Sequence, residues 1–202
     1  MTQVKICGVC DLAGAEIAAE AGADLIGFHF CSSPRRISPR EALEIVDALG
    51  NRRPTLVGVF IDQTAAEVEE TSAFVGLDMV QLHGSEPPGF RSSRAVMKAL
   101  KVRDGRVPAS EDWPEPILLD SWSADQRGGT GRSWDWETAR ELAGRRRVFF
   151  AGGLNPGNVT DLVRSIRPYG VDVSSGVERA TRVKDAALVS AFVQAVREAD
   201  EG

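Results

Sequence analysis

The sequence predicts an α/β fold: one domain over residues 1–202, built as a (β/α)8 barrel, also called a TIM barrel. Two observations predict it. Short β-rich segments alternate with helical patterns, and this alternation is typical of a parallel sheet. Near the C-terminus, two buried segments run directly into turns of small residues, Gly152-Gly153 and Ser174-Ser175-Gly176. Barrels of this class bind phosphate at such turns, after the seventh and eighth strands.

Eight strands are expected along the chain. They cover 3–7, 24–30, 55–61, 78–82, 95–100, 116–120, 147–151 and 170–173. Several are almost continuous apolar runs, such as Ile117-Leu118-Leu119, and runs of this kind fit parallel strands that are buried on both faces. Eight repeats favour a closed barrel over an open sheet.

Helical patterns connect most of these strands. Amphipathic helices are expected at 11–22, 64–76 and 184–198. The pairs Ser38-Pro39 and Asn155-Pro156 have the pattern of a helix N-cap followed by a first-turn proline, and the segment 62–64 offers polar caps for the third helix. The last helix is expected to place four apolar residues on one face: Leu188, Ala191, Phe192 and Val196.

Two connections have little helical character. Pro87, Pro88 and Gly89 interrupt the segment after the fourth strand, and Pro108 and Pro114 interrupt the segment after the fifth. Because proline breaks a helix interior, we expect short or degenerate helices after strands 4 and 5.

The composition argues against some classes of binding partner. The formal net charge of −5 gives no basic field for nucleic acid. No apolar run approaches the ~20 residues that span a bilayer, and the N-terminal residues lack the layout of a signal peptide. The odd number of cysteines, 3, argues against a disulfide framework. We therefore expect a cytoplasmic protein with reduced thiols and no nucleic-acid or membrane partner. Both monomer and homodimer fit this architecture.

Polar side chains and small turn residues gather where the expected strands end. In chain order they are Lys5, Cys7, His29, Asp62, His83, Lys98, Asp120, Gly152, Gly153, Asp172, Ser174, Ser175 and Gly176. Function in a barrel of this kind sits at the C-terminal ends of the strands. The set holds more ionisable groups than packing requires.

Cys7 ends the first strand and is the candidate base or nucleophile. Lys5 lies two residues earlier, on the same side of the strand, and a nearby cation lowers the pKa of a thiol. The alternative is a buried structural cysteine. Cys7 and Cys10 also form a Cys-x-x-Cys pair, but zinc or redox chemistry needs further ligands or a thioredoxin-like setting, so no metal is expected.

Asp120 is the candidate general acid. It follows a buried run, and partial desolvation favours the protonated form of a carboxyl group; the alternative is an aspartate that caps a loop. The following segment contains Gly128-Gly129-Thr130-Gly131, which suits either a lid over the barrel mouth or an ordinary flexible loop.

Three further side chains are open to two interpretations. Arg35 can form two parallel hydrogen bonds with a substrate carboxylate, or its side chain can be exposed to solvent. His83 can position the substrate or form a hydrogen bond with a neighbouring loop. His29 is interpreted as a packed histidine or one whose hydrogen bonds are satisfied by its neighbours. An acid, a base and a phosphate anchor together suggest proton transfer on a sugar phosphate. Such a reaction needs no cofactor, and no dinucleotide or ATP motif is present.

Together these segments resemble the phosphoribosylanthranilate isomerase family along nearly the whole chain. The segments that carry the resemblance are 4–8, 21–28, 33–39, 57–60, 80–84, 118–121, 128–131, 134–136, 152–156 and 172–178. The resemblance implies the third step of tryptophan biosynthesis from anthranilate, an Amadori rearrangement of an aminoaldose phosphate.

The resemblance also implies roles for individual residues. Asp120 matches the acid that opens the furanose ring, and Cys7 matches the base that removes the C2 proton. Arg35 is expected near the anthranilate carboxylate and Asp172 near the sugar. The phosphate is expected on the glycine and serine turns: Gly152, Gly153, Ser174, Ser175 and Gly176.

The chain also departs from the family pattern. His29 stands where an apolar residue is common, the segment 86–94 is short, and 178–185 lacks the usual Pro-Gly. Two rival hypotheses are a different phosphate-binding barrel enzyme and a sugar-phosphate-binding protein without catalysis. The cysteine at the end of the first strand argues against a histidine-pathway isomerase, which uses an aspartate there.

Overall fold

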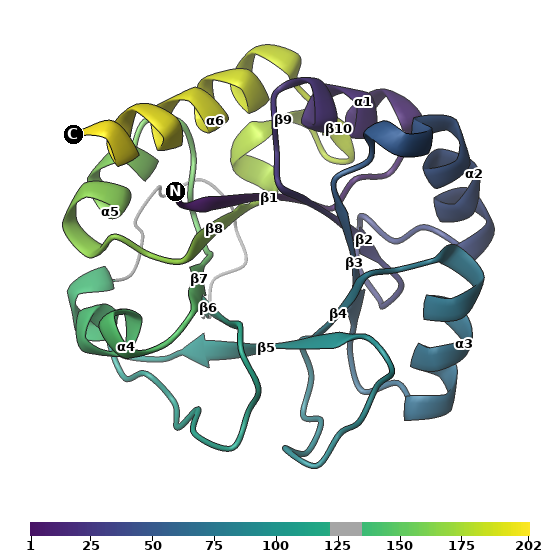
Figure 1. Cartoon of the computed structure of the whole chain (residues 1–202), viewed down its shortest axis with the longest axis horizontal. Helices are drawn as coiled ribbons and strands as arrows, with labels where there is room; N and C mark the ends of the chain where they lie inside the picture. The colour runs from purple at the N-terminus through teal and green to yellow at the C-terminus, as the bar shows by residue number, and fades with distance from the viewer. Residues whose placement is uncertain (122–134) are drawn as a thin grey trace.

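The computed structural model describes residues 1–121 and 135–202, and its centre is a closed barrel of eight parallel strands in sequence order (Figure 1). The strands are β1 Gln3–Cys7, β2 Leu25–His29, β3 Thr55–Phe60, β4 Met79–Leu82, β5 Ala95–Val102, β6 Ile117–Ser121, β7 Val148–Phe150 and β8 Gly170–Val173. Pairing of β1 with β8 closes the ring, with Lys5 opposite Asp172. The predicted barrel is confirmed, and each strand lies where the sequence predicted it, with small shifts at the ends.

Helices cover the barrel unevenly. They are α1 Leu12–Glu20, α2 Pro39–Leu49, α3 Ala65–Val75, α4 Arg140–Arg145, α5 Val159–Ile166 and α6 Ala186–Glu201. Short 3-10 segments lie at η1 Gly50–Arg52, η2 Trp136–Ala139 and η3 Ser175–Val177, and a hairpin is formed by β9 Glu178–Ala180 and β10 Val183–Lys184. The connection from β4 to β5 and residues 103–116, all described, contain no helix, so only loops cover the barrel beside β5 (Figure 1).

The helix starts follow from local capping, with one correction. Ser38 and Thr64 are N-caps, as their sequences predicted, and each accepts a hydrogen bond from the third residue of its helix. Both also complete a capping box, which was not predicted from the sequence. The prediction that Pro156 opens a helix was wrong, because α5 begins at Val159. The Asn155 side chain instead accepts a hydrogen bond from Gly157 N at 2.8 Å, which forms a turn before the helix.

The apolar face predicted for the last helix is only partly buried. Val183 and Lys184 pair with β9, so α6 begins two residues later than expected, after its N-cap Asp185. Phe192 and Val196 are buried, whereas Leu188 and Ala191 are exposed. Val189, Val193 and Ala199 complete the buried face.

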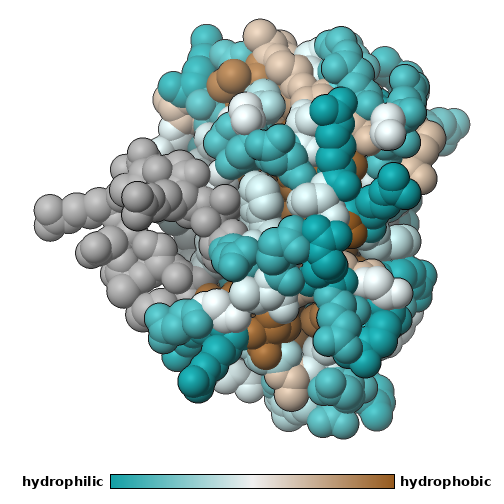
Figure 2. Space-filling model, turned by 90° about the vertical axis from the view of Figure 1, so that its left-hand side faces the viewer, coloured by the Kyte–Doolittle hydropathy of each residue, from teal (hydrophilic) through white to brown (hydrophobic). Residues whose placement is uncertain are grey.

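Alternation along the strands creates two apolar layers. Side chains such as Val4 and Ile6 point outward against the helices, whereas Leu118 and Phe149 pack inside the barrel. The face shown in Figure 2 is mostly hydrophilic, with small separate hydrophobic spots. None of the described helices combines the length and apolar character that crossing a membrane requires.

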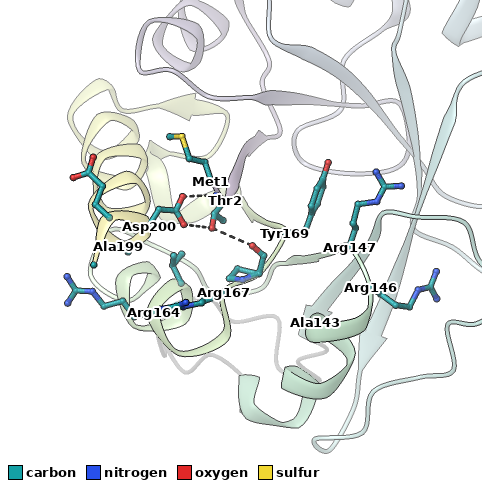
Figure 3. A pocket seen from close by; sticks show the side chains of 14 residues that line it. Met1, Thr2, Ala143, Arg146, Arg147, Arg164, Arg167, Tyr169, Ala199 and Asp200 are labelled. Carbon is teal, nitrogen blue, oxygen red and sulfur yellow. Dashed lines mark hydrogen bonds between the residues drawn. The ribbon is translucent and has the colours of Figure 1, made fainter.

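The chain ends meet at the end of the barrel where the strands begin. Thr2 donates from its backbone N and its hydroxyl to Asp200, at 2.6 and 2.7 Å. These contacts lie in a hollow of about 990 Å³ between the chain ends, α4 and α5 (Figure 3). The candidate site lies at the opposite end, so this hollow is separate from it.

Candidate active site

A pocket of about 350 Å³ lies at the C-terminal ends of the strands. The structure brings every candidate site residue to its wall: Cys7, Arg35, His83, Asp120, Gly152, Gly153, Asp172, Ser174, Ser175 and Gly176. These residues come from six strands or the loops that follow them. They meet because parallel strands end at the same rim of the barrel. The segment 128–131, considered as a lid, lies outside the described residues.

Cys7 lies inside the barrel above a buried ion pair. Lys5, fully buried, donates to Asp172 Oδ1 at 2.8 Å. Gly27 on the neighbouring strand makes room for both Lys5 and Cys7. A Cβ atom at Gly27 would lie 2.9 Å from Cys7 Sγ and 3.1 Å from Lys5 Nζ. A glycine at this position therefore permits the close packing of thiol and ammonium.

Two opposing effects set the ionisation of Cys7. Burial raises the pKa of the Cys7 thiol, while the positive charge of Lys5 acts to lower it; the net direction is upward. For Lys5, burial is the largest single effect and would lower the pKa, but the charges of Asp172 and Cys7 and the hydrogen bonds to both together outweigh it, so the pKa is raised. Lys5 thus stays positively charged beside the thiol. The site can form a thiolate only with help from such neighbours.

Asp120, in β6, lies beside a histidine that follows β4, two strands away in the barrel. His83 Nε2 lies 3.3 Å from Asp120 Oδ2. Gln81 Nε2 lies 3.3 Å from His83 Nδ1. Since the amide nitrogen is a donor only, Nδ1 accepts and the neutral ring carries its proton on Nε2, the nitrogen nearer to the carboxylate. The acid candidate therefore has a fixed orientation toward the pocket.

Arg35 lies at the pocket wall with most of its guanidinium engaged. Its Nε donates to Glu178 Oε1 at 2.7 Å, and its Nη2 donates to Oε2 at 2.5 Å. Lys184 donates to the same Oε1 at 3.0 Å and to the carbonyl oxygen of Cys7 at 2.6 Å. The buried carboxylate of Glu178 thus joins the loop after β2 to the hairpin after β8. Through Lys184, it is also connected to the end of β1.

The two turns at β7 and β8 leave backbone donors open. Gly152 and Gly153 have φ values of 87° and 69°, which favour glycine. The backbone N–H groups of four turn residues donate to no acceptor among the described residues: Gly152, Gly153, Ser175 and Gly176. The Ser174 hydroxyl is also buried without a partner. These groups together are suited to bind an anion such as phosphate.

Sequence reasoning missed several residues of the site. Gln81 contacts His83, and Lys184 connects three segments. Neither stands out in the sequence: Gln81 belongs to a buried strand, and the contact of Lys184 with Cys7 joins positions 177 residues apart. His29, interpreted as packed, lines the pocket and contacts Cys7 Sγ at 3.3 Å. Its position at the C-terminal end of a strand was the available signal. Over residues 1–121 and 135–202, no cluster of three His, Cys, Asp or Glu side chains is placed to hold a metal ion.

Comparison with known proteins identifies the family. The model of a family described as N-(5'phosphoribosyl)anthranilate (PRA) isomerase matches residues 4–195. The chain belongs to this family. The curated N-(5'-phosphoribosyl)anthranilate isomerase of Pelobacter propionicus is 42% identical, over 98% of this chain and 97% of that protein. That of Desulforudis audaxviator is 44% identical, over 98% of this chain and 100% of that protein.

Solved isomerases share the barrel. The enzyme from Thermus thermophilus has a TM-score of 0.86 at 36% identity, covering 98% of this chain and 99% of that one. Another phosphoribosylanthranilate isomerase was solved in complex with reduced 1-(o-carboxyphenylamino)-1-deoxyribulose 5-phosphate. It has a TM-score of 0.82 at 33% identity, covering 98% of this chain and 100% of that one.

Proposed function

We propose that this isomerase converts N-(5'-phosphoribosyl)anthranilate into 1-(2-carboxyphenylamino)-1-deoxyribulose 5-phosphate, a step of tryptophan biosynthesis. One observation carries the proposal: a thiol and a carboxyl group, Cys7 and Asp120, line the same pocket as two turns with open backbone donors. The family membership supplies the substrate class. The proposed reaction uses no cofactor.

Asp120 and Cys7 divide the proton transfers between them. Protonated Asp120 donates to the furanose ring oxygen, the bond from C1 to that oxygen breaks, and the nitrogen lone pair forms a Schiff base. The Cys7 thiolate then removes the C2 proton, and the electrons of that bond form an enolamine. The enolamine gains a proton at C1 and loses its hydroxyl proton. These two transfers balance the proton that Cys7 took and the proton that Asp120 gave.

The remaining pocket residues are proposed to hold the substrate. The phosphate is placed on the backbone donors of Gly152, Gly153, Ser174, Ser175 and Gly176. His83 and Asp172 face the sugar from opposite parts of the rim. Arg35 contacts the anthranilate carboxylate with the part of its guanidinium that Glu178 leaves open.

Substrate turnover tests the proposal directly. The substrate is generated in place from anthranilate and phosphoribosyl pyrophosphate, and its fluorescence is followed with wild type, Cys7→Ala and Asp120→Asn. Wild type is expected to remove the fluorescence, and each variant to do so at least ~10²-fold more slowly, as the loss of a general base or acid predicts.

The matched control is Cys10→Ala. The Cys10 thiol contacts the carbonyl oxygens of Gly8 and Arg35 at 3.4 Å and does not line the pocket, so this variant should keep wild-type turnover. Wild-type activity in Cys7→Ala would remove Cys7 as the base. Folded wild-type protein without turnover would contradict the proposed function.

The cellular setting and assembly are also proposals. All 3 cysteines are free, which suits the reducing cytoplasm. The expected assembly, a monomer or a homodimer, stays a prediction that light scattering on purified protein decides.

A further inference from the structure

His29 contacts the proposed base but has no part in the function described so far. It is the last residue of β2, and its side chain lines the pocket. Its Nε2 lies 3.3 Å from Cys7 Sγ, and its Nδ1 lies 2.8 Å from Ser33 Oγ. The imidazole thus bridges the thiol and a hydroxyl of the loop that follows β2.

The contacts of Ser33 favour one direction for this bridge. Ser33 Oγ accepts a hydrogen bond from the backbone N of Arg35 at 3.1 Å. Its own proton has no acceptor other than His29 Nδ1 among the described residues. With Nδ1 as the acceptor, the neutral ring carries its proton on Nε2 and points it at the sulfur. Burial and the charge of Lys5 lower the pKa of His29 to about 4, which keeps the ring neutral near pH 7.

We propose that His29 is a positioning residue for Cys7: held by Ser33, it donates its Nε2–H to the sulfur and stabilises the thiolate. The inference rests on the proposed role of Cys7 as the base. A hydrogen bond to the charged form of a group favours that form. It follows that Cys7 without His29 is a thiolate less often at a given pH.

The surroundings of the sulfur explain why a neutral donor matters. Charged and titratable groups face Cys7 from β1, β8, β10 and the segment that follows β2, and they are Lys5, Cys31, Arg35, Asp172 and Lys184. Burial raises the pKa of the Cys7 thiol, and the Asp172 carboxylate adds to this. Lys5 opposes both but shares its charge with Asp172. His29 supplies a hydrogen bond to the thiolate without another full charge.

The first test measures the pH dependence of Cys7 alkylation by iodoacetamide, followed by fragment mass spectrometry to separate Cys7 from Cys10. The variants are His29→Leu, which removes the donor, and His29→Gln, which keeps a neutral N–H of similar reach. We expect His29→Leu to shift the apparent pKa of Cys7 upward by about one unit, the size of one hydrogen bond. His29→Gln is expected to restore most of the shift. An unchanged profile in His29→Leu, or a shift in His29→Gln as large as that in His29→Leu, would overturn the proposal.

A second test uses the wild-type protein, so it does not depend on how a variant folds. The chain has 2 histidines, and ¹⁵N-labelled imidazole signals can be assigned by comparison with His83→Gln. We expect the His29 ring to be neutral near pH 7 with its proton on Nε2. A proton on Nδ1 would make the ring an acceptor from the thiol and overturn the proposed direction. Both tests work without turnover, so a failure of the proposed function would be seen separately.

Discussion

At the scale of single residues, the site depends on close packing around one sulfur atom. Cys7 shares the barrel interior with the ammonium of Lys5, and Gly27 supplies the space for both. A side chain at Gly27 has no free volume to enter. Small displacements matter here, because a misplacement of about 1 Å costs an enzyme roughly 10²-fold in rate.

Gly27→Ala is therefore expected to reduce kcat/KM by about 10-fold or more, because the new methyl group would lie 2.9 Å from Cys7 Sγ and must displace it. The matched control is Gly89→Ala, which meets nothing within 4 Å and should keep wild-type activity. Steady-state kinetics, with circular dichroism to verify folding, measures both. Full activity in Gly27→Ala would show that the thiol position is not critical.

At the scale of elements, the turns after β7 and β8 hold each other in place. A Cβ atom at Gly176, in η3, would collide with the carbonyl oxygen of Leu154. Gly176→Ala must therefore separate the two turns that are proposed to bind phosphate. We expect a loss of about 1–3 kcal/mol in the free energy of unfolding, as overpacking typically gives, and a raised KM.

Gly144→Ala serves as the control for this substitution. Gly144 lies in α4 and has nothing within 4 Å of a new Cβ, so alanine should raise helix stability by up to about 1 kcal/mol. Urea unfolding and KM report on both variants. If Gly176→Ala is measurably destabilised but its KM is unchanged, the two turns do not bind the phosphate.

The elements also show what a sequence can and cannot predict. The strands and the capped helices were predictable, because apolar runs and capping residues act locally, as at Ser38 and Thr64. The start of α6 was not, because the pairing of Val183 and Lys184 with β9 is decided by the hairpin. In the site, the strand ends located Cys7 and Asp120. The pairing of Arg35 with Glu178 joins positions 143 residues apart, and no local pattern contains it.

At the scale of the whole molecule, Glu178 connects distant parts of the chain. Its side chain is 3% exposed and binds Arg35 and Lys184. Burial alone would raise the pKa of Glu178, but the hydrogen bonds and charges of its two partners lower it below the ordinary value of 4.5. Folding therefore favours the ionised carboxylate. The resulting stability is fully present above the unfolded pKa and is lost as the pH falls through the lower folded pKa.

Glu178→Gln is expected to reduce the free energy of unfolding by about 3 kcal/mol near pH 7, because it leaves two cations without their carboxylate. The difference from wild type should shrink as the pH falls below the ordinary glutamate pKa and through the lower pKa of the folded protein, where the wild-type carboxylate is also neutralised. Urea unfolding of both proteins at several pH values measures this difference. Glu137→Gln is the control: Glu137 also pairs with an arginine, but its side chain is 55% exposed, and exposed pairs contribute ~1 kcal/mol or less. A similar loss in both variants, or a difference independent of pH, would show that the buried carboxylate does not hold these segments together.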